Sequence, residues 1–308
     1  MEIIEFEFKR ERKLGEFVQD FINLLKIIIG HLSKVLFRML ALPICGMLLV
    51  GYYLSTQLNM HVDYSSGELF NVISSFMVAF LVMTLIGMIA FGLTIEYFIM
   101  LRDRRCLDFG EKEIWQAFKT HIGSYFRFLG AAIIVGMLTL IPLSIVLFAC
   151  MFVPMVGSIG MGIVFAMVGL WFFTAFMLYR EGYYELIDTF QGAYTLLKKK
   201  FFEYGTASYV VNFLFQTLLY TMTLVPSVVI GLIAYNSVGF NDNFFDTYFG
   251  KTLVSMGASL LTLFFIVYNM FSVLSYGIIY ESGKELQFGE NVFQRIAKIG
   301  RRGDDKPI

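Results

Sequence analysis

The sequence predicts an all-α integral membrane protein in which six transmembrane helices form three pseudo-repeats. Three observations lead to this fold class: the composition, six long apolar runs and an amphipathic sequence pattern that is repeated along the chain. Of the 308 residues, 57% are hydrophobic and only 16% are charged, whereas soluble domains are about 45–50% apolar and about 25% charged. A soluble core could not bury this excess, so we expect residues 1–308 to form a single polytopic membrane domain.

The first copy of this pattern is at residues 14–37, where apolar and polar side chains recur at three- and four-residue steps, the period of a helix. It returns at residues 109–118, 185–194 and 288–296, each time with an aromatic residue one or two positions before a glutamine. Two apolar runs lie between successive copies. The pattern indicates three units of one amphipathic cytoplasmic helix and two spans, followed by a fourth, C-terminal amphipathic helix.

Each amphipathic helix has an apolar stripe. The stripes are predicted to contain Phe17, Val18, Phe21, Leu25, Ile28, Leu32 and Val35 in the first copy, Trp115, Phe118, Ile122 and Phe126 in the second, and Leu186, Phe190, Ala193, Leu197 and Phe201 in the third. Basic, aromatic-rich helices beside a membrane tend to lie in its interface. In the alternative arrangement the helices pack on one another as a cytoplasmic layer, and the two arrangements can coexist.

Six spans are expected, at residues 35–55, 69–100, 128–150, 153–179, 206–235 and 252–280. Each run contains the roughly 20 mainly apolar residues that a helix needs to cross a bilayer. Residues 1–34 then form a cytoplasmic segment with the first amphipathic helix, residues 35–280 form the six spans, and residues 281–308 form a cytoplasmic amphipathic tail.

The orientation follows from the lysines and arginines. Of the 24 in the chain, all except Lys251 lie in the N-terminal segment up to Arg38, in the second and fourth connections, or in the C-terminal tail. Basic residues accumulate in cytoplasmic loops. We therefore expect both termini to be cytoplasmic.

The candidate polar site consists of the polar side chains within or beside the spans, because such residues are costly in a bilayer. They are Arg38, Glu96, Asn212, Gln216 and Asn269. Glu96 either pairs with Arg38 near the inner face or finds a local partner or the interface. Asn212 and Gln216 are four residues apart and share a helical face, where they either bond across helices or line a polar pathway.

An aromatic outer loop is the second candidate site. It carries Phe240, Phe244, Phe245, Tyr248 and Phe249 beside two aspartates. Aromatic residues at this depth commonly anchor a loop among lipid headgroups. The alternative is a docking surface for an outer partner or amphiphile.

No catalytic, cofactor or metal motif is found, so the sequence predicts no enzyme, no cofactor and no metal site. The basic tail lacks the aromatic platform that stacks nucleic-acid bases, and we expect no nucleic-acid partner. Anionic headgroups at the cytoplasmic face are the expected lipid partners, together with other membrane proteins.

The segment REGYYELIDTFQGAYTLLKKKFF, residues 180–202, resembles the inner-face helix of bacterial six-span proteins related to the membrane domain of some glycerophosphodiester phosphodiesterases. The resemblance implies an inner-face helix before each pair of spans, and it implies a bacterial inner membrane as the location. The catalytic domain of those phosphodiesterases has no counterpart in this sequence, so the resemblance assigns no functional residue.

The expected function is that of a non-enzymatic scaffold or accessory subunit in a membrane assembly, because four surface helices and much aromatic surface occur without an assembled catalytic group. The alternative is a carrier or flippase for lipids or other amphiphiles, suggested by the repeats, the prolines within spans and the amides. A lipid enzyme would need clustered His, Asp or Glu at one membrane face.

Overall fold

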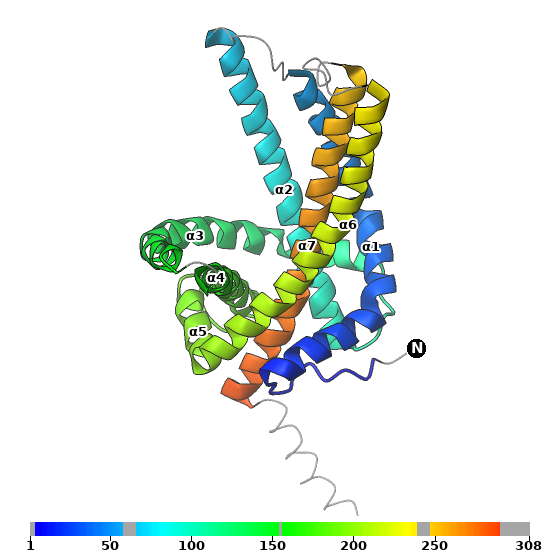
Figure 1. Ribbon diagram of the computed structural model, residues 1–308. Helices are drawn as coiled ribbons and strands as arrows, with labels where there is room; N and C mark the ends of the chain where they lie inside the picture. Colours follow the sequence, from blue (N-terminus) through cyan, green and yellow to red (C-terminus); the bar gives the residue numbers. More distant parts are fainter. Residues whose placement is uncertain (1–3, 58–65, 154–155, 239–246, 290–308) are drawn as a thin grey trace, which may run out of the picture. The chain divides into compact units, whose positions relative to one another are not determined.

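The computed structural model describes residues 4–57, 66–153, 156–238 and 247–289. In these ranges the chain forms helices and no strand (Figure 1), which confirms the all-α class. The elements are α1 (Leu14–Gln57), α2 (Ser66–Arg104), α3 (Glu111–Met151), α4 (Val156–Arg180), α5 (Asp188–Leu197), the 3₁₀ turn η1 (Lys198–Lys200), α6 (Phe201–Val238) and α7 (Tyr248–Phe288).

Three helical stretches are long and apolar enough to cross a membrane. They are Phe70–Arg104 of α2, Glu111–Met151 of α3 and Val156–Arg180 of α4, with mean hydropathies of 2.5, 2.6 and 2.1. A stretch of about 20 apolar residues suffices to span the hydrocarbon layer. Three helices of this fold are thus able to span a membrane, while the full set of six spans stays a prediction.

The amphipathic copies differ in how they join the apolar runs. The first copy continues into the following run as one helix, α1, and the second does so within α3. The third copy is the separate helix α5, because the chain tightens into η1 at Lys198–Lys200 before α6 begins. The fourth copy lies almost entirely outside the described residues.

The chain folds into two compact units, and the boundaries between them fall inside α1, α2, α6 and α7. Unit 1 comprises residues 1–31, 95–213 and 272–308, and unit 2 comprises residues 32–94 and 214–271. Unit 1 therefore holds α3, α4 and α5 complete, whereas unit 2 is built from parts of the four divided helices. The groove, the buried charge clusters and the polar cavity described below lie within unit 1.

The first and third apolar stripes are largely buried, as the helical period predicts. In α1, Phe17, Phe21 and Ile28 are at most 2% exposed. In α5, Phe190 and Ala193 are buried as well. These helices thus pack into the protein with the faces that the sequence indicates.

The predicted stripe of the second copy is wrong in part. Phe118 is buried, but Trp115, Ile122 and Phe126 are 40%, 40% and 51% exposed. The buried residues of α3 are Ile114, Phe118, Tyr125 and Phe128. The reason is tertiary: the rings of Tyr125 and Phe128 lie 4.7 and 5.1 Å from that of Phe176 in α4, which turns the other apolar side of α3 outward.

Candidate functional site

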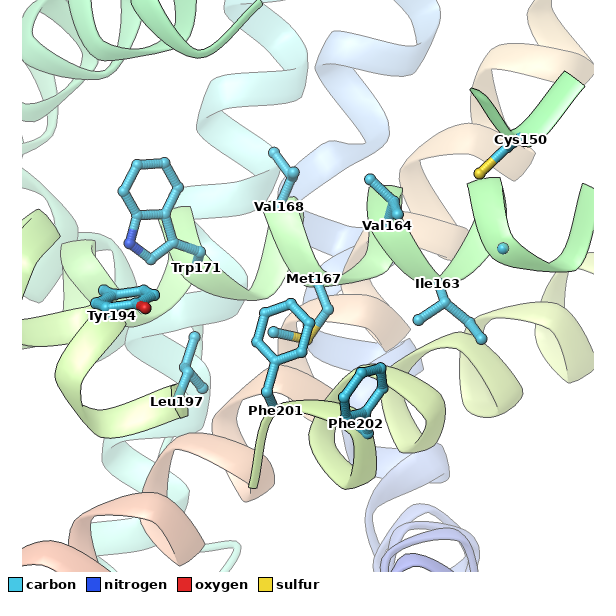
Figure 2. Close-up of a pocket in the computed structure, with 11 residues that line it drawn as sticks. Cys150, Ile163, Val164, Met167, Val168, Trp171, Tyr194, Leu197, Phe201 and Phe202 are labelled. Atoms are coloured by element: carbon cyan, nitrogen blue, oxygen red, sulfur yellow. The ribbon is translucent and has the colours of Figure 1, made fainter. Parts of the chain in front are cut away.

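An apolar groove in unit 1 has the character of a binding site (Figure 2). Its volume is about 500 Å³. The lining residues come from the last turn of α3, from α4, from α5 and from the start of α6: Cys150, Gly160, Ile163, Val164, Met167, Val168, Trp171, Tyr194, Leu197, Phe201 and Phe202.

The packing of α5 along α4 forms one end of the groove, where Trp171 and Tyr194 lie (Figure 2). The indole Nε1 of Trp171 donates a hydrogen bond to the carbonyl oxygen of Phe190, at 2.9 Å. The Phe190 ring also lies 5.5 Å from Phe128 and 5.6 Å from Trp171, in stacked and edge-on geometries. These aromatic contacts hold α5 against the spanning helix.

The floor of the groove depends on a glycine at the start of α6. A Cβ atom at Gly205 would lie 2.6 Å from Cγ of Met167, well inside van der Waals contact. A larger residue here would require the Met167 side chain to shift. Phe201 and Phe202 precede it and lie on the Met167 side of α4 (Figure 2).

The chemistry of the groove suits a hydrocarbon chain. Its walls are aliphatic and aromatic, and the Trp171 N–H is already bonded within the protein. From Gly160 to Trp171, at about 1.5 Å per residue, the α4 wall is about 16 Å long. This is roughly half of the ~30 Å hydrocarbon thickness, the depth of one leaflet.

Basic side chains follow the α5 end of the groove directly in the sequence. Leu197 lines the groove, and Lys198 and Lys199 of η1 come next and are exposed. The Nζ atom of Lys198 lies 6.0 Å from the ring centre of Tyr194, within the range of a cation–π contact. A chain in the groove would thus have cations near one end.

A second feature of unit 1 is a cluster of buried charges where α2 and α4 end and α7 passes. Arg102 pairs with Glu181 and, at 2.7 Å, with Glu281. Lys284 Nζ lies 2.8 Å from Glu181 Oε2, and the Tyr280 hydroxyl donates to the same oxygen at 2.6 Å. The cluster ties three helices together through charge-assisted hydrogen bonds.

The pKa values of the two carboxyl groups in this cluster are shifted in opposite directions. Burial alone would raise the pKa of Glu181, but Arg102 and Lys284 outweigh it and hold that pKa below the ordinary value of 4.5. Burial dominates at Glu281 and raises its pKa, although Arg102 and Lys284 oppose the change. Burial would lower the pKa of Lys284, yet Glu281 and Glu181 raise it to about 12. Arg102 and Lys284 therefore stabilise the ionised form of Glu181.

Replacing Glu181 by glutamine should destabilise the protein at neutral pH by about 1.5–3 kcal/mol, the range for hydrogen bonds to charged groups, and Glu281→Gln should cost less. The pKa of Glu181 is lower in the folded state than the ordinary value of 4.5. Its ionised carboxylate therefore stabilises the fold above about pH 4.5, and this stabilisation is lost as the pH falls through the folded-state pKa. The loss of stability in acid should therefore be shallower in Glu181→Gln than in wild type. Detergent unfolding curves at about pH 7 and about pH 4 test this, and equal costs at neutral pH would contradict it.

The N-terminal segment is packed onto α7 by a buried arginine. Arg12 is 1% exposed, and its Nε lies 2.7 Å from Asp20. Its backbone N–H donates to Ser282 Oγ at 3.1 Å, and its Nη1 donates to the carbonyl oxygen of Phe8 at 3.0 Å. Burial lowers the pKa of Arg12, with Asp20 opposing the change. The segment before α1 is thus part of the folded unit.

Glu96, a predicted site residue, is buried and paired with Arg180 at the end of α4. Arg180 Nη2 lies 3.2 Å from Glu96 Oε2, and the Tyr125 hydroxyl donates to Glu96 Oε1 at 3.0 Å. Arg180 Nη2 also lies 2.8 Å from His121 Nδ1. Arg38, the partner considered from the sequence, is exposed and belongs to unit 2.

The amides are divided between different environments. Asn212 is 6% exposed, accepts a hydrogen bond from Ser272 at 2.9 Å and donates one to the Tyr276 hydroxyl at 3.1 Å, so it joins α6 to α7 as expected of an amide in a span. Gln216 is exposed and donates to Tyr220 within α6. Asn269 is half-buried on α7.

The aromatic outer loop falls mostly outside the described residues. Phe240, Phe244 and Phe245 lie there. Tyr248 and Phe249, in the first turn of α7, are 85% and 54% exposed. Exposure of these two rings fits both the lipid anchor and the docking surface, so the choice between them stays a prediction.

Sequence reasoning did not identify the groove or the Arg102–Glu181–Glu281 cluster. One usable signal existed for the cluster, since Arg102, Glu181 and Glu281 all stand within two residues of a predicted span end. No comparable signal marks the groove, whose walls come from four segments. Among the described residues, no group of three or more His, Cys, Asp or Glu could hold a metal.

Comparison with known proteins gives no relative: no family model, no curated protein and no solved structure matches the chain.

Proposed function

We propose that this chain is a non-enzymatic membrane protein that binds lipids or other amphiphiles in the groove between α4, α5 and the start of α6, and acts as their carrier. The observation that carries the proposal is a groove of about 500 Å³ with walls of aliphatic and aromatic side chains. Apolar sites of this size accept apolar ligands. The exposed lysines of η1 at one end favour an amphiphile with an anionic headgroup.

The proposed setting is a bacterial inner membrane crossed six times, with both termini in the cytoplasm and three repeats of an amphipathic helix and two spans. The helices α1, α6 and α7 contain the remaining three apolar runs and are 44, 38 and 41 residues long. These lengths exceed the roughly 20 residues that a span requires. The distribution of lysine and arginine supports the orientation.

Filling the groove should remove the bound amphiphile. In Val164→Trp an indole occupies the space beside Val168 and Trp171, so we expect the co-purified lipid to fall by about tenfold or more, equivalent to about 1.4 kcal/mol of lost binding. The matched control is Val146→Trp, at a position on α3 that is exposed and does not line the groove. Mass spectrometry of protein extracted with its native bilayer patch reads the lipid directly.

Cys150 gives an independent readout, because its thiol lies at the other end of the groove (Figure 2). With Cys45 and Cys106 replaced by alanine, an apolar maleimide should label Cys150 more slowly when lipid is bound and faster after delipidation. Equal lipid retention in the two tryptophan variants, with labelling insensitive to lipid, would refute the proposal.

A second candidate function is that of a scaffold or accessory subunit, and the outward side of α3 favours it. Trp115, Ile122 and Phe126 form an exposed helical stripe, and the most apolar window of α3 has no buried residue. Such a surface needs lipid or a protein partner. Stoichiometric membrane proteins in the native bilayer patch, lost on Ile122→Asn, would favour this function over the carrier.

A further inference from the structure

A polar cavity of about 500 Å³ lies in unit 1, apart in its lining residues from the apolar groove. Its charged lining residues are Lys9, Arg102, Asp103, Arg105, Glu181 and Lys284. Four of these side chains are cationic and two are anionic, so the lining carries an excess of positive charge. An excess of this kind attracts anions.

Arg105 is held in the cavity wall by a backbone conformation that is unfavourable for arginine. It is the residue after α2, and its φ of 51° lies in the left-handed region, where glycine is usual at a helix C-terminus. Its N–H donates to the carbonyl oxygen of Leu101 at 3.0 Å, and its own carbonyl accepts from Ile4 at 2.8 Å. Strained residues of this type often mark functional sites.

The guanidinium of Arg105 is bonded to no described residue, although those of its neighbours Arg102 and Arg104 are both paired. Arg102 uses Nε and Nη1 for Asp103, Glu181 and Glu281, and its Nη2 has no hydrogen-bond partner among the described residues. The carbonyl ends of α2 and α4 offset part of the positive charge. They do not supply the planar, bidentate partner that an arginine binds best, which is a carboxylate or a phosphate.

The cavity also lies where two candidate spans would leave the hydrocarbon layer. Two candidate spans end at Arg104 and Arg180, and the lining residues Arg105 and Glu181 follow them directly. Lipid phosphates are found at this depth.

We propose that this cavity is a binding site for a phosphate group, with Arg105 as its principal ligand and Arg102 and Lys284 supporting it. The phosphate belongs either to the headgroup of an anionic lipid or to a free phosphate in the cytoplasm. The proposal does not depend on the apolar groove, since no lining residue is shared.

The test uses the full chain in nanodiscs of phosphatidylcholine, with Arg105→Gln, Arg105→Gly and, as matched control, Arg127→Gln. Arg127 is exposed on α3 and does not line the cavity. One arm titrates inorganic phosphate at constant ionic strength. The other counts retained phosphatidylglycerol by native mass spectrometry after mixing that lipid into the discs.

We expect both Arg105 variants to bind about tenfold or more weakly than wild type, the loss of one charge-assisted contact, and Arg127→Gln to bind as wild type. Arg105→Gly should keep or raise the melting temperature, because glycine adopts a positive φ without strain. Loss of binding in this variant therefore cannot be ascribed to unfolding.

The inorganic phosphate titration and the phosphatidylglycerol count together distinguish a free phosphate from a lipid headgroup. Loss in the inorganic phosphate arm identifies a free phosphate site, and loss confined to phosphatidylglycerol identifies a headgroup site. The proposal is overturned if wild type binds neither probe, if Arg105→Gly binds as wild type, or if Arg127→Gln loses as much binding.

Discussion

Replacing Arg102 by methionine should lower the free energy of unfolding by about 3–5 kcal/mol, because it removes the cation that Glu181 and Glu281 share. The three side chains are 12%, 13% and 0% exposed, so the substitution leaves the buried Glu281 carboxyl group without the guanidinium that pairs with it. Methionine keeps most of the volume and removes only the charge and the donors. Lys284 still reaches Glu181, which leaves Glu281 as the carboxyl group most affected.

The control is a pair of the same chemistry at the surface. Arg104 and Glu113 lie 2.5 Å apart but are 43% and 44% exposed, and such exposed pairs contribute about 0–1 kcal/mol. We therefore expect Arg104→Gln to unfold almost as wild type. Unfolding in mixed detergent micelles, followed by tryptophan fluorescence, compares the variants. A cost for Arg102→Met no larger than that for Arg104→Gln would show that the cluster does not stabilise the fold.

The helical fold could be predicted because its signal is local. Phe17, Phe21 and Ile28 recur at the period of a helix, and the structure buries all three. The two ranges 111–151 and 156–180 are apolar enough to be recognised from composition alone. Neither inference needs to know which segment packs against which.

The second copy shows where local signals fail. Trp115, Ile122 and Phe126 have the spacing of a buried face, yet they are exposed. The face that is buried contains Tyr125, whose hydroxyl donates to Glu96 in α2 and whose ring packs on Phe176 in α4. Both partners are distant in sequence, so periodicity could not decide between two apolar sides of one helix.

The sequence could identify single residues of the candidate sites but not the partners with which they form a site. Glu96 was recognised as a costly buried charge, but its partner Arg180 lies 84 positions away. The groove is made by side chains that each look like ordinary core or lipid-facing residues, such as Val164 and Leu197. Arg105 carries no sequence signal at all, because its importance rests on a φ of 51° and on a guanidinium that no described residue satisfies.

Replacing Arg180 by methionine should also cost about 3–5 kcal/mol of unfolding free energy, because it leaves the Glu96 carboxylate, 1% exposed, without its cation. Glu96→Gln should cost less than Arg180→Met. Its amide oxygen still accepts from Tyr125, and Arg180 is 16% exposed and near His121. The double variant should then be more stable than Arg180→Met alone, since it removes the isolated charge. A double-mutant cycle in detergent measures this coupling, which is typically about 0.5–3 kcal/mol for residues in contact. Additive effects of the two substitutions would mean that the pair acts only by filling space, and that α2 and α4 are joined by packing rather than by charge.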